Sequence, residues 1–233
     1  MRHLILASIL VAGCAAPGAA ADTRTLSDSV PADGVQVVSL DSSIGDVEIR
    51  AVEGAREITV EVLLTPRRGG LFSSKKRAEQ DVAAASLSIK ASGGKLALHV
   101  APKGGDDRRF EEDWRIELPP TIALELDHGV GDIDIRGLSS RTEIDAGVGD
   151  VRVETSAGDV AIDIGVGDVL VQAPAAAYAS AEGSCGVGDV RMTVAGERIE
   201  GGGFVGTSAS WKGAGSGRIE VSAGVGDTVI TLD

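Results

Sequence analysis

Apolar and polar residues alternate with a period of two along most of the chain from residue 35 onward. In an extended strand this period sends successive side chains to opposite faces, so it predicts strands with one dry and one wet face. Clear examples are residues 35–40, residues 57–64, and two runs on either side of Gly93 and Gly94 that have the form of a hairpin. The pattern therefore predicts an all-β protein.

Residues 73–85 depart from this alternation. They are rich in helix formers behind a serine that can cap a helix, so we expect a helical or mobile insertion within 66–85. The segment carries the densest basic cluster of the chain, which consists of Lys75, Lys76 and Arg77 close to Arg67 and Arg68. Such a run is either a solvated face or a contact with anionic head groups.

Four residues, Gly-Val-Gly-Asp, recur five times without change, at 129–132, 147–150, 165–168, 186–189 and 224–227. Counted along the chain from Asp to Asp, the successive intervals are 18, 18, 21 and 38. The last interval is close to two repeats, and Val205-Gly206-Thr207 stands where the missing turn would be. A fixed period near 18 is typical of a chain that winds, with each turn stacking on the one before.

Each repeat has apolar residues at the first and third positions after the aspartate, as in Val151 and Val153, with polar residues between them. A half-repeat, Ser156-Ala157-Gly158-Asp159, places its aspartate midway between Asp150 and Asp168, so each coil contains two strands and two turns. We therefore predict a short parallel β-solenoid over 121–233, with about 18 residues and two strands per coil. A less regular β-rich region, 35–120, precedes it. One coil buries too little to fold alone, so the stack requires protected ends.

The repeated turn has a physical interpretation. Its glycines allow positive φ at a corner, its valine packs into the core, and its aspartate accepts a bond from backbone N–H groups of the turn. Stacked aspartates repel each other by about 3–4 kcal/mol at an effective dielectric near 20. Hydrogen bonds, outward splaying or a shared cation must relieve this repulsion. The aspartates concerned are Asp132, Asp150, Asp159, Asp168, Asp189 and Asp227.

Calcium is the alternative role for this column. Calcium-binding nonapeptide repeats of the form G-G-x-G-x-D-x-U-x also wind into a parallel coil, and the half-repeat of similar length invites the comparison. Here, however, the aspartate directly follows a glycine, and full turns recur at twice the spacing of the nonapeptide. We therefore interpret the aspartates as turn caps and expect no metal or other cofactor.

The first residues form a predicted signal peptide, 1–21. The apolar run 4–11 has the length of a secretory signal and is too short to span a bilayer. Val11-Ala12-Gly13-Cys14 has the form of a bacterial lipobox in which Cys14 is lipidated, and Ala19-Ala20-Ala21 is the alternative, an ordinary cleavage site. We favour the lipobox because Cys14 directly follows the apolar run. A polar tether, 22–34, would then join an anchored, exported chain to its folded part.

The composition and the motifs argue against two classes of function, nucleic-acid binding and catalysis. The net charge of −13 and the pI near 4.7 argue against a nucleic-acid partner. The chain contains no H-E-x-x-H, C-x-x-C or G-x-S-x-G motif, so we expect no enzyme. His128 and Cys185 fall at inward positions of the repeat and are interpreted as core residues. Trp211 lies in a stretch outside the repeat, where it either covers the core or projects as a contact point.

The segments Glu117-Leu118-Pro119-Pro120 and Leu124-Glu125-Leu126, then 131–138, then repeated Gly-Asp-Val strands together resemble the bacterial putative-adhesin family of β-strand-repeat proteins. The resemblance covers roughly 35–233. It implies envelope attachment or adhesion and offers no catalytic residues.

We therefore expect a non-catalytic cell-envelope protein that displays a rigid acidic surface to an envelope or surface protein. Its membrane contact would be the lipid anchor, and its place the outer membrane, facing the periplasm or the surface. Two alternatives remain: a self-assembling envelope scaffold whose end coils stack between molecules, and a calcium-stabilised repeat module.

Overall fold

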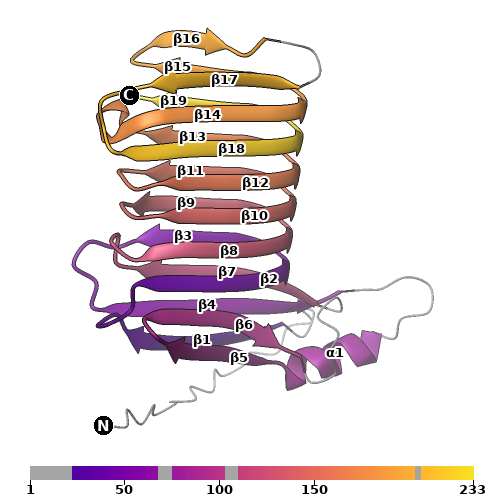
Figure 1. Ribbon diagram of the computed structural model, residues 1–233. Coiled ribbons are helices and arrows are strands. Elements are labelled where there is room, and N and C mark those ends of the chain that lie inside the picture. Colours follow the sequence, from indigo (N-terminus) through magenta and orange to yellow (C-terminus); the bar gives the residue numbers. More distant parts are fainter. Residues whose placement is uncertain (1–22, 68–74, 103–109, 203–205) are drawn as a thin grey trace.

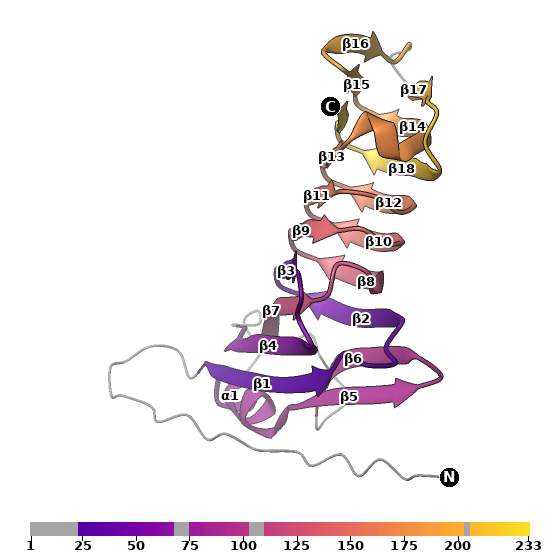
Figure 2. The same cartoon turned by 90° about the vertical axis from the view of Figure 1, so that its left-hand side faces the viewer.

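The computed structural model describes residues 23–67, 75–102, 110–202 and 206–233. This part of the chain is all-β, built from two mixed sheets that face each other, as predicted (Figures 1 and 2). A single α-helix, α1 (Lys75–Ala84), and a short 3₁₀ turn, η2 (Ala175–Ala177), accompany the strands in these ranges. Of the expected helical or mobile insertion within 66–85, the part 75–84 is helical, and residues 68–74 lie outside the described ranges.

Sheet A has ten strands, seven of which run parallel at its centre. In spatial order the parallel strands are β7 (Phe110–Leu118), β3 (Val47–Ala51), β9 (Ile133–Leu138), β11 (Val151–Thr155), β13 (Val169–Ala173), β19 (Thr228–Leu232) and β15 (Val190–Val194). Antiparallel strands close both edges, namely β1 (Arg24–Pro31) and β4 (Glu57–Pro66) at one edge and β16 (Glu197–Glu200) at the other.

Sheet B has nine strands and the same plan. Its parallel strands, in the matching order, are β6 (Lys95–Ala101), β2 (Val37–Ile44), β8 (Ala123–Val130), β10 (Thr142–Val148), β12 (Val160–Val166), β18 (Gly217–Val225) and β14 (Tyr178–Val187). Antiparallel strands again close the edges, β5 (Ser86–Ser92) beside β6 and β17 (Thr207–Lys212) beside β14.

Each parallel strand of sheet B leads along the chain into the facing strand of sheet A, so the described residues form seven two-strand coils. Equivalent residues of neighbouring coils lie directly opposite each other; Ile144, for example, pairs with Leu126 on one side and with Ile162 on the other. Figure 2 shows the two sheets side by side, with the strands of sheet A on the left and those of sheet B on the right along the stack. The two-residue alternation therefore becomes rows of equivalent side chains that run along the stack.

The spatial order of the coils differs from their order in the sequence. From the α1 end the coils are β6–β7, β2–β3, β8–β9, β10–β11, β12–β13, β18–β19 and β14–β15. The last strands of the chain thus lie between β12–β13 and β14–β15, which precede them in sequence. The expectation that each turn stacks on the one before holds only from β8 to β13.

The segment between Asp189 and Asp227 explains why the last coil lies out of chain order. After β15 the chain turns back through Ala195 and Gly196 into antiparallel β16, and β17 then pairs antiparallel with β14. Antiparallel pairing excludes these strands from the parallel coils, so the predicted turn at Val205-Gly206-Thr207 is not a corner of the repeat. Thr207 begins β17 and is buried, and Val205 lies outside the described residues.

The N-terminal half belongs to the same stack. Strand β2 pairs in parallel with β8, and β3 pairs with β9, so both sheets run through the expected boundary at residue 120. The expected tether 22–34 also contains a strand, because β1 pairs with β4 along its whole length. Half-buried side chains alternate with exposed ones along β1, among them Leu26 and Val30, and this weak alternation was missed in the sequence.

Aliphatic side chains fill the space between the sheets, and the strand positions that the repeat predicts to face inward are buried, in contrast to the valine of the corner. These positions are Leu126, Ile133, Ile135, Ile144, Val151, Val153, Ile162, Val169, Val171, Val190, Met192, Val221, Thr228 and Ile230. Both ends of this core are covered. Val82 of α1 packs into it at one end, and Trp211 of β17 packs half-buried against it at the other. Covered ends fit the requirement that a stack of coils must not expose its core.

Candidate functional site: the aspartate ladder and the outer faces

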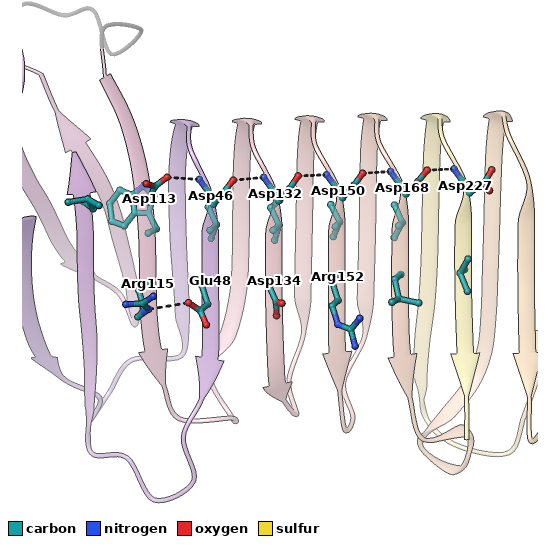
Figure 3. A pocket seen from close by; sticks show the side chains of 18 of the residues that line it. Asp46, Glu48, Asp113, Arg115, Asp132, Asp134, Asp150, Arg152, Asp168 and Asp227 are labelled. Carbon is teal, nitrogen blue, oxygen red and sulfur yellow. Dashed lines mark hydrogen bonds and ion pairs between the residues drawn. The ribbon is translucent and has the colours of Figure 1, made fainter. Parts of the chain in front are cut away.

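Seven aspartates, one from each coil, form a continuous hydrogen-bonded ladder where the chain enters sheet A, and Figure 3 shows six of them, from Asp113 to Asp227. The carboxylate Oδ1 of each aspartate except the last, Asp189, accepts the backbone N–H of the aspartate in the next coil. The N–H···Oδ1 pairs, with their N···O distances, are Asp46 to Asp113 (3.1 Å), Asp132 to Asp46 (3.0 Å), Asp150 to Asp132 (2.9 Å), Asp168 to Asp150 (2.9 Å), Asp227 to Asp168 (2.7 Å) and Asp189 to Asp227 (2.9 Å).

The ladder differs from the predicted turn cap in its partner. The predicted bond lay within one turn, whereas the observed bonds join one coil to the next. Five of the six predicted aspartates are members, and the sixth, Asp159, stands at the other corner, where its Oδ1 accepts the backbone N–H of Arg218 at 2.9 Å. The sequence analysis missed Asp46 and Asp113 as members. Asp46 has a signal, the Gly-Asp-Val of 45–47, and Asp113 has none.

The two glycines of each turn bring neighbouring corners close enough for this ladder. Gly149 has φ +144°, and a Cβ placed on it would lie 1.9 Å from the carbonyl oxygen of Gly131. A Cβ on Gly147 would lie 2.4 Å from the carbonyl oxygen of Gly129. Only glycine fits at either position, which explains why the motif repeats without change.

The valine of the motif faces solvent, against the prediction that it packs into the core. The side chains of these valines are between 45% and 54% exposed, and they are Val130, Val148, Val166, Val187 and Val225. At these corners the glycines on either side of the valine lie against the backbone of the next coil, and the valine between them is left on the outside. These valines pair in register and form an exposed aliphatic row beside the ladder.

The outer face of sheet B carries columns of like charge. Four aspartates on adjacent parallel strands lie directly opposite one another and are exposed, in the order Asp41, Asp127, Asp145 and Asp163. A second column on the same strands and their neighbours contains Glu125, Glu143, Ala161, Glu220 and Glu182. We call these eight carboxylates the sheet-B acidic face.

Few cations neutralise this face within the described part of the chain. Lys95 pairs with Glu125 at 2.6 Å, and Arg141 pairs with Glu143 at 2.6 Å. Five of the carboxylates surround an open groove of about 600 Å³ together with Ser184 and Ser222. Since adjacent strands are about 4.8 Å apart, the aspartates repel one another across the sheet.

The outer face of sheet A is different, because opposite charges alternate on it. Glu48 bonds Arg50 and Arg115, and these hydrogen bonds lower the pKa of the Glu48 carboxyl. Asp134 bonds Arg136 at 2.7 Å and 2.5 Å, which lowers the pKa of that carboxyl too. A groove of about 950 Å³ beside the ladder is lined by charges of both signs, among them Glu48, Asp134, Arg115 and Arg152 (Figure 3). Sheet A is therefore balanced in charge where sheet B is not.

The remaining predicted residues fall as follows. His128 is buried, as expected for a core residue, and both its ring nitrogens are without a hydrogen-bond partner among the described residues. Burial lowers the pKa of its imidazole. Cys185 is buried and its thiol is free, with Sγ 2.8 Å from the carbonyl oxygen of Gly226. Cys14 and the signal segment 1–21 lie outside the described residues.

Neither a metal cluster nor a membrane-spanning helix is found in the parts of the chain that the structure describes. No group of three or more His, Cys, Asp or Glu side chains in 23–67, 75–102, 110–202 and 206–233 is arranged to hold a metal ion. In the same ranges no helix has the length and apolar character needed to cross a bilayer.

Comparison with known proteins gives a match in fold only. No protein-family model matches the chain, and no curated protein does. A putative cell adhesion protein from Clostridium sporogenes matches with a TM-score of 0.55 and 18% sequence identity, over 91% of this chain and all (100%) of that chain. A putative adhesin from Bacteroides fragilis matches with a TM-score of 0.37 and 12% identity, over 89% of this chain and 97% of that chain. At so low an identity the first likeness shows a shared fold.

Proposed function

We propose that this chain is a non-catalytic, adhesin-like protein of the cell envelope, built as a β-solenoid, that binds a positively charged partner through the sheet-B acidic face. The observation that carries the proposal is the column Asp41, Asp127, Asp145 and Asp163, four exposed like charges in register on one face. The name of the Clostridium sporogenes protein, a putative cell adhesion protein, supports the adhesin-like part of the proposal.

Repulsion between the aspartates of this column destabilises the isolated protein, and a cationic partner that binds along the column relieves that repulsion. Two unit charges about 4.8 Å apart repel by about 0.9 kcal/mol in a water-like dielectric and by about 3.5 kcal/mol at an effective dielectric of 20. A partner that places lysine or arginine side chains along the column removes this repulsion and adds attraction. Such complementarity raises the association rate and makes binding sensitive to salt.

The fold keeps these charges at fixed distances. The parallel ladders of both sheets and the aspartate ladder at the corners set the spacing from coil to coil. The partner therefore meets a preorganised row and does not have to order it, which lowers the entropic cost of binding.

The proposal places the protein in the envelope as an outer-membrane lipoprotein anchored through Cys14, facing the periplasm or the surface. The lipobox-like segment 11–14 supports this location. The alternative, end-to-end assembly, would require the edge strands β16 and β17, or β1 and β5, to pair with those of another molecule. We propose that the ladder aspartates act through hydrogen bonds to backbone N–H groups and do not require calcium.

A peptide of eight lysines tests the acidic face directly, by calorimetric titration at 20 mM and 200 mM NaCl. Two triple variants have the same net charge, and only the first neutralises the acidic face: Asp127→Asn/Asp145→Asn/Asp163→Asn, and Glu53→Gln/Glu117→Gln/Glu154→Gln. We expect the first to weaken binding at least tenfold at low salt and the second to change it less than twofold. Equal losses in the two variants would mean that net charge alone attracts the peptide and would overturn the proposal. Capture of envelope proteins by the wild type but not by the first variant would then identify the natural partner.

A further inference from the structure

The start of β1 is fixed to the C-terminal end of α1. The guanidinium Nη1 of Arg24 donates to the carbonyl oxygens of Val82 at 3.2 Å, Ala83 at 2.8 Å and Ala85 at 2.8 Å. A helix leaves its last carbonyls without intrahelical partners, so a cation is favourable there. The chain therefore enters the described fold at the α1 end of the stack (Figures 1 and 2).

This entry point sets which end of the molecule lies near an anchor at Cys14. Only the short segment 15–23 separates Cys14 from Arg24, and it can span at most about 32 Å. Sheet A contains ten strands, which at about 4.8 Å each place its far edge roughly 43 Å from β1. With an anchor at Cys14, the α1 end would therefore stay close to the bilayer, and the β16–β17 end could lie farther from it.

The exposed side of α1 is cationic. Lys76 and Arg77 are exposed, whereas Ala78 and Val82 face the core. The helix also carries Glu79 and Asp81, which are half-buried. The solvent side of the helix that covers this end of the core therefore presents positive charge.

The net charge is also distributed unevenly along the stack. Residues 119–233, which contain the coils from β8–β9 to the far end, have 18 acidic and 7 basic side chains, whereas residues 22–118 have 17 acidic and 14 basic ones. The sheet-B acidic face begins at β2, two strands in from the edge strand β5, and continues toward the far end. An anionic surface would therefore repel the rest of the stack more strongly than the α1 end.

We propose that the α1 end docks on an anionic lipid surface through Lys76 and Arg77, and that this contact holds the stack upright with the sheet-B acidic face directed away from the bilayer. The inference rests on the proposed envelope function, whose anchor it orients. Screening makes the contact feasible despite the net charge of −13, because the Debye length of about 8–10 Å leaves only the closest charges effective. Each basic side chain near an anionic leaflet strengthens binding by about fivefold.

Co-sedimentation with vesicles tests the docking without the lipid anchor. The chain from Asp22, which contains every described residue, is mixed with vesicles of phosphatidylcholine alone, or with vesicles in which about one lipid in three is phosphatidylglycerol. Each mixture is measured at 50 mM and 300 mM NaCl. We expect binding to the anionic vesicles at low salt, a marked loss at high salt, and none to the neutral vesicles. Equal binding to both vesicle types, or to neither, would overturn the inference.

A pair of charge-reversal variants locates the contact. Lys76→Glu/Arg77→Glu acts at the α1 end, and Lys212→Glu/Arg218→Glu changes the net charge equally at the other end. We expect the first pair to lose about 30-fold or more in affinity for the anionic vesicles, and the second pair to change it less than threefold. Acidic residues in the first turn of a helix are favourable, so the first pair should keep its fold, which circular dichroism checks. Similar losses in both pairs would refute docking through α1.

The octalysine titration separates this inference from the proposed function. The Lys76→Glu/Arg77→Glu variant should bind octalysine at least as well as the wild type, because the sheet-B acidic face is unchanged. If vesicle binding fails while octalysine binding depends on the acidic face, only the docking is wrong. If the reverse holds, only the acidic-face proposal is wrong.

Discussion

Replacing Asp150 by asparagine or by alanine separates the two opposing electrostatic effects in the ladder. Asp150 accepts the N–H of Asp168 at 2.9 Å, and its own N–H donates to Asp132 at 2.9 Å. Asparagine keeps an acceptor oxygen and removes the charge. Alanine removes both, while the backbone N–H of residue 150 keeps its bond in either variant.

The magnitudes follow from this geometry. Repulsion from two neighbouring carboxylates about one strand spacing away amounts to roughly 1–2 kcal/mol for exposed groups. A hydrogen bond from a backbone N–H is worth about 1 kcal/mol to a neutral acceptor and somewhat more to a carboxylate. Asp150→Asn should therefore be more stable than the wild type by about 0.5–1 kcal/mol at low salt. Asp150→Ala should be less stable than Asp150→Asn by about 1 kcal/mol.

Thermal unfolding followed by circular dichroism, at 20 mM and 1 M NaCl, measures both differences. A change of about 1 kcal/mol corresponds to about 2–4 °C in Tm for a chain of this size. The advantage of Asp150→Asn should disappear at 1 M NaCl, where the Debye length is about 3 Å, and the gap between the Asn and Ala variants should persist. The control is Asp163, which has like-charged neighbours but lies outside the ladder, so its Asn and Ala variants should be equally stable. An Asp150→Asn variant that is clearly less stable than the wild type at low salt would refute this reasoning.

Gly149→Ala should prevent folding or lower the free energy of unfolding by more than about 3 kcal/mol, because its Cβ would lie 1.9 Å from a carbonyl oxygen. Gly34→Ala, at φ +81° with no atom within 4 Å of the added Cβ, should lower it by only about 1 kcal/mol. The yield of folded protein and urea unfolding compare the two variants. A chain that ends at residue 216 should expose the core and become sensitive to protease, because the missing β18–β19 coil lies inside the stack; a protease-resistant product would contradict the coil order. The lowered pKa of His128 means that the unfolded chain binds its proton more tightly, so stability should fall as pH drops below about 6.5, and His128→Ala should reduce this loss; urea unfolding from pH 7.5 to 5 measures it. Addition of a calcium chelator should leave Tm unchanged, and a drop of several degrees would show that the ladder holds a cation.

The regular part of the fold was readable from the sequence because its constraint is local. The two-residue alternation fixed which side of each strand is buried, and the regular interval between aspartates fixed which residues lie opposite one another between β8 and β13. Val151 and Val153 are buried where the pattern placed them. The order of the coils was not readable, since the same alternation and the same Gly-Asp corner fit a coil at any level of the stack.

The details of the corner depended on contacts between coils. Val148 was predicted to be buried because valine is apolar, yet the path of the backbone around the corner, which the sequence does not display, leaves it at the surface. Asp113 joined the ladder without any glycine signal, because β7 pairs in parallel with β3 and brings its N-terminal part to the same level. The sheet-B acidic face could be anticipated only as a net charge, since the register of distant strands decides which carboxylates share a column.

The central claim is that the coils stack in register but out of chain order, and disulfide cross-linking tests it directly. Adjacent parallel strands bring paired Cα atoms to about 4.8 Å, within disulfide range, while second neighbours are about 9.6 Å apart and cannot be bridged. In a chain with Cys14→Ser and Cys185→Ala, the structure predicts rapid oxidation of Leu170→Cys with Val229→Cys, which pair between β13 and β19. It predicts no bond between Leu170→Cys and Arg191→Cys, because β19 separates their strands. Efficient cross-linking of residues 170 and 191, with none between 170 and 229, would show that the coils follow chain order and would contradict this account.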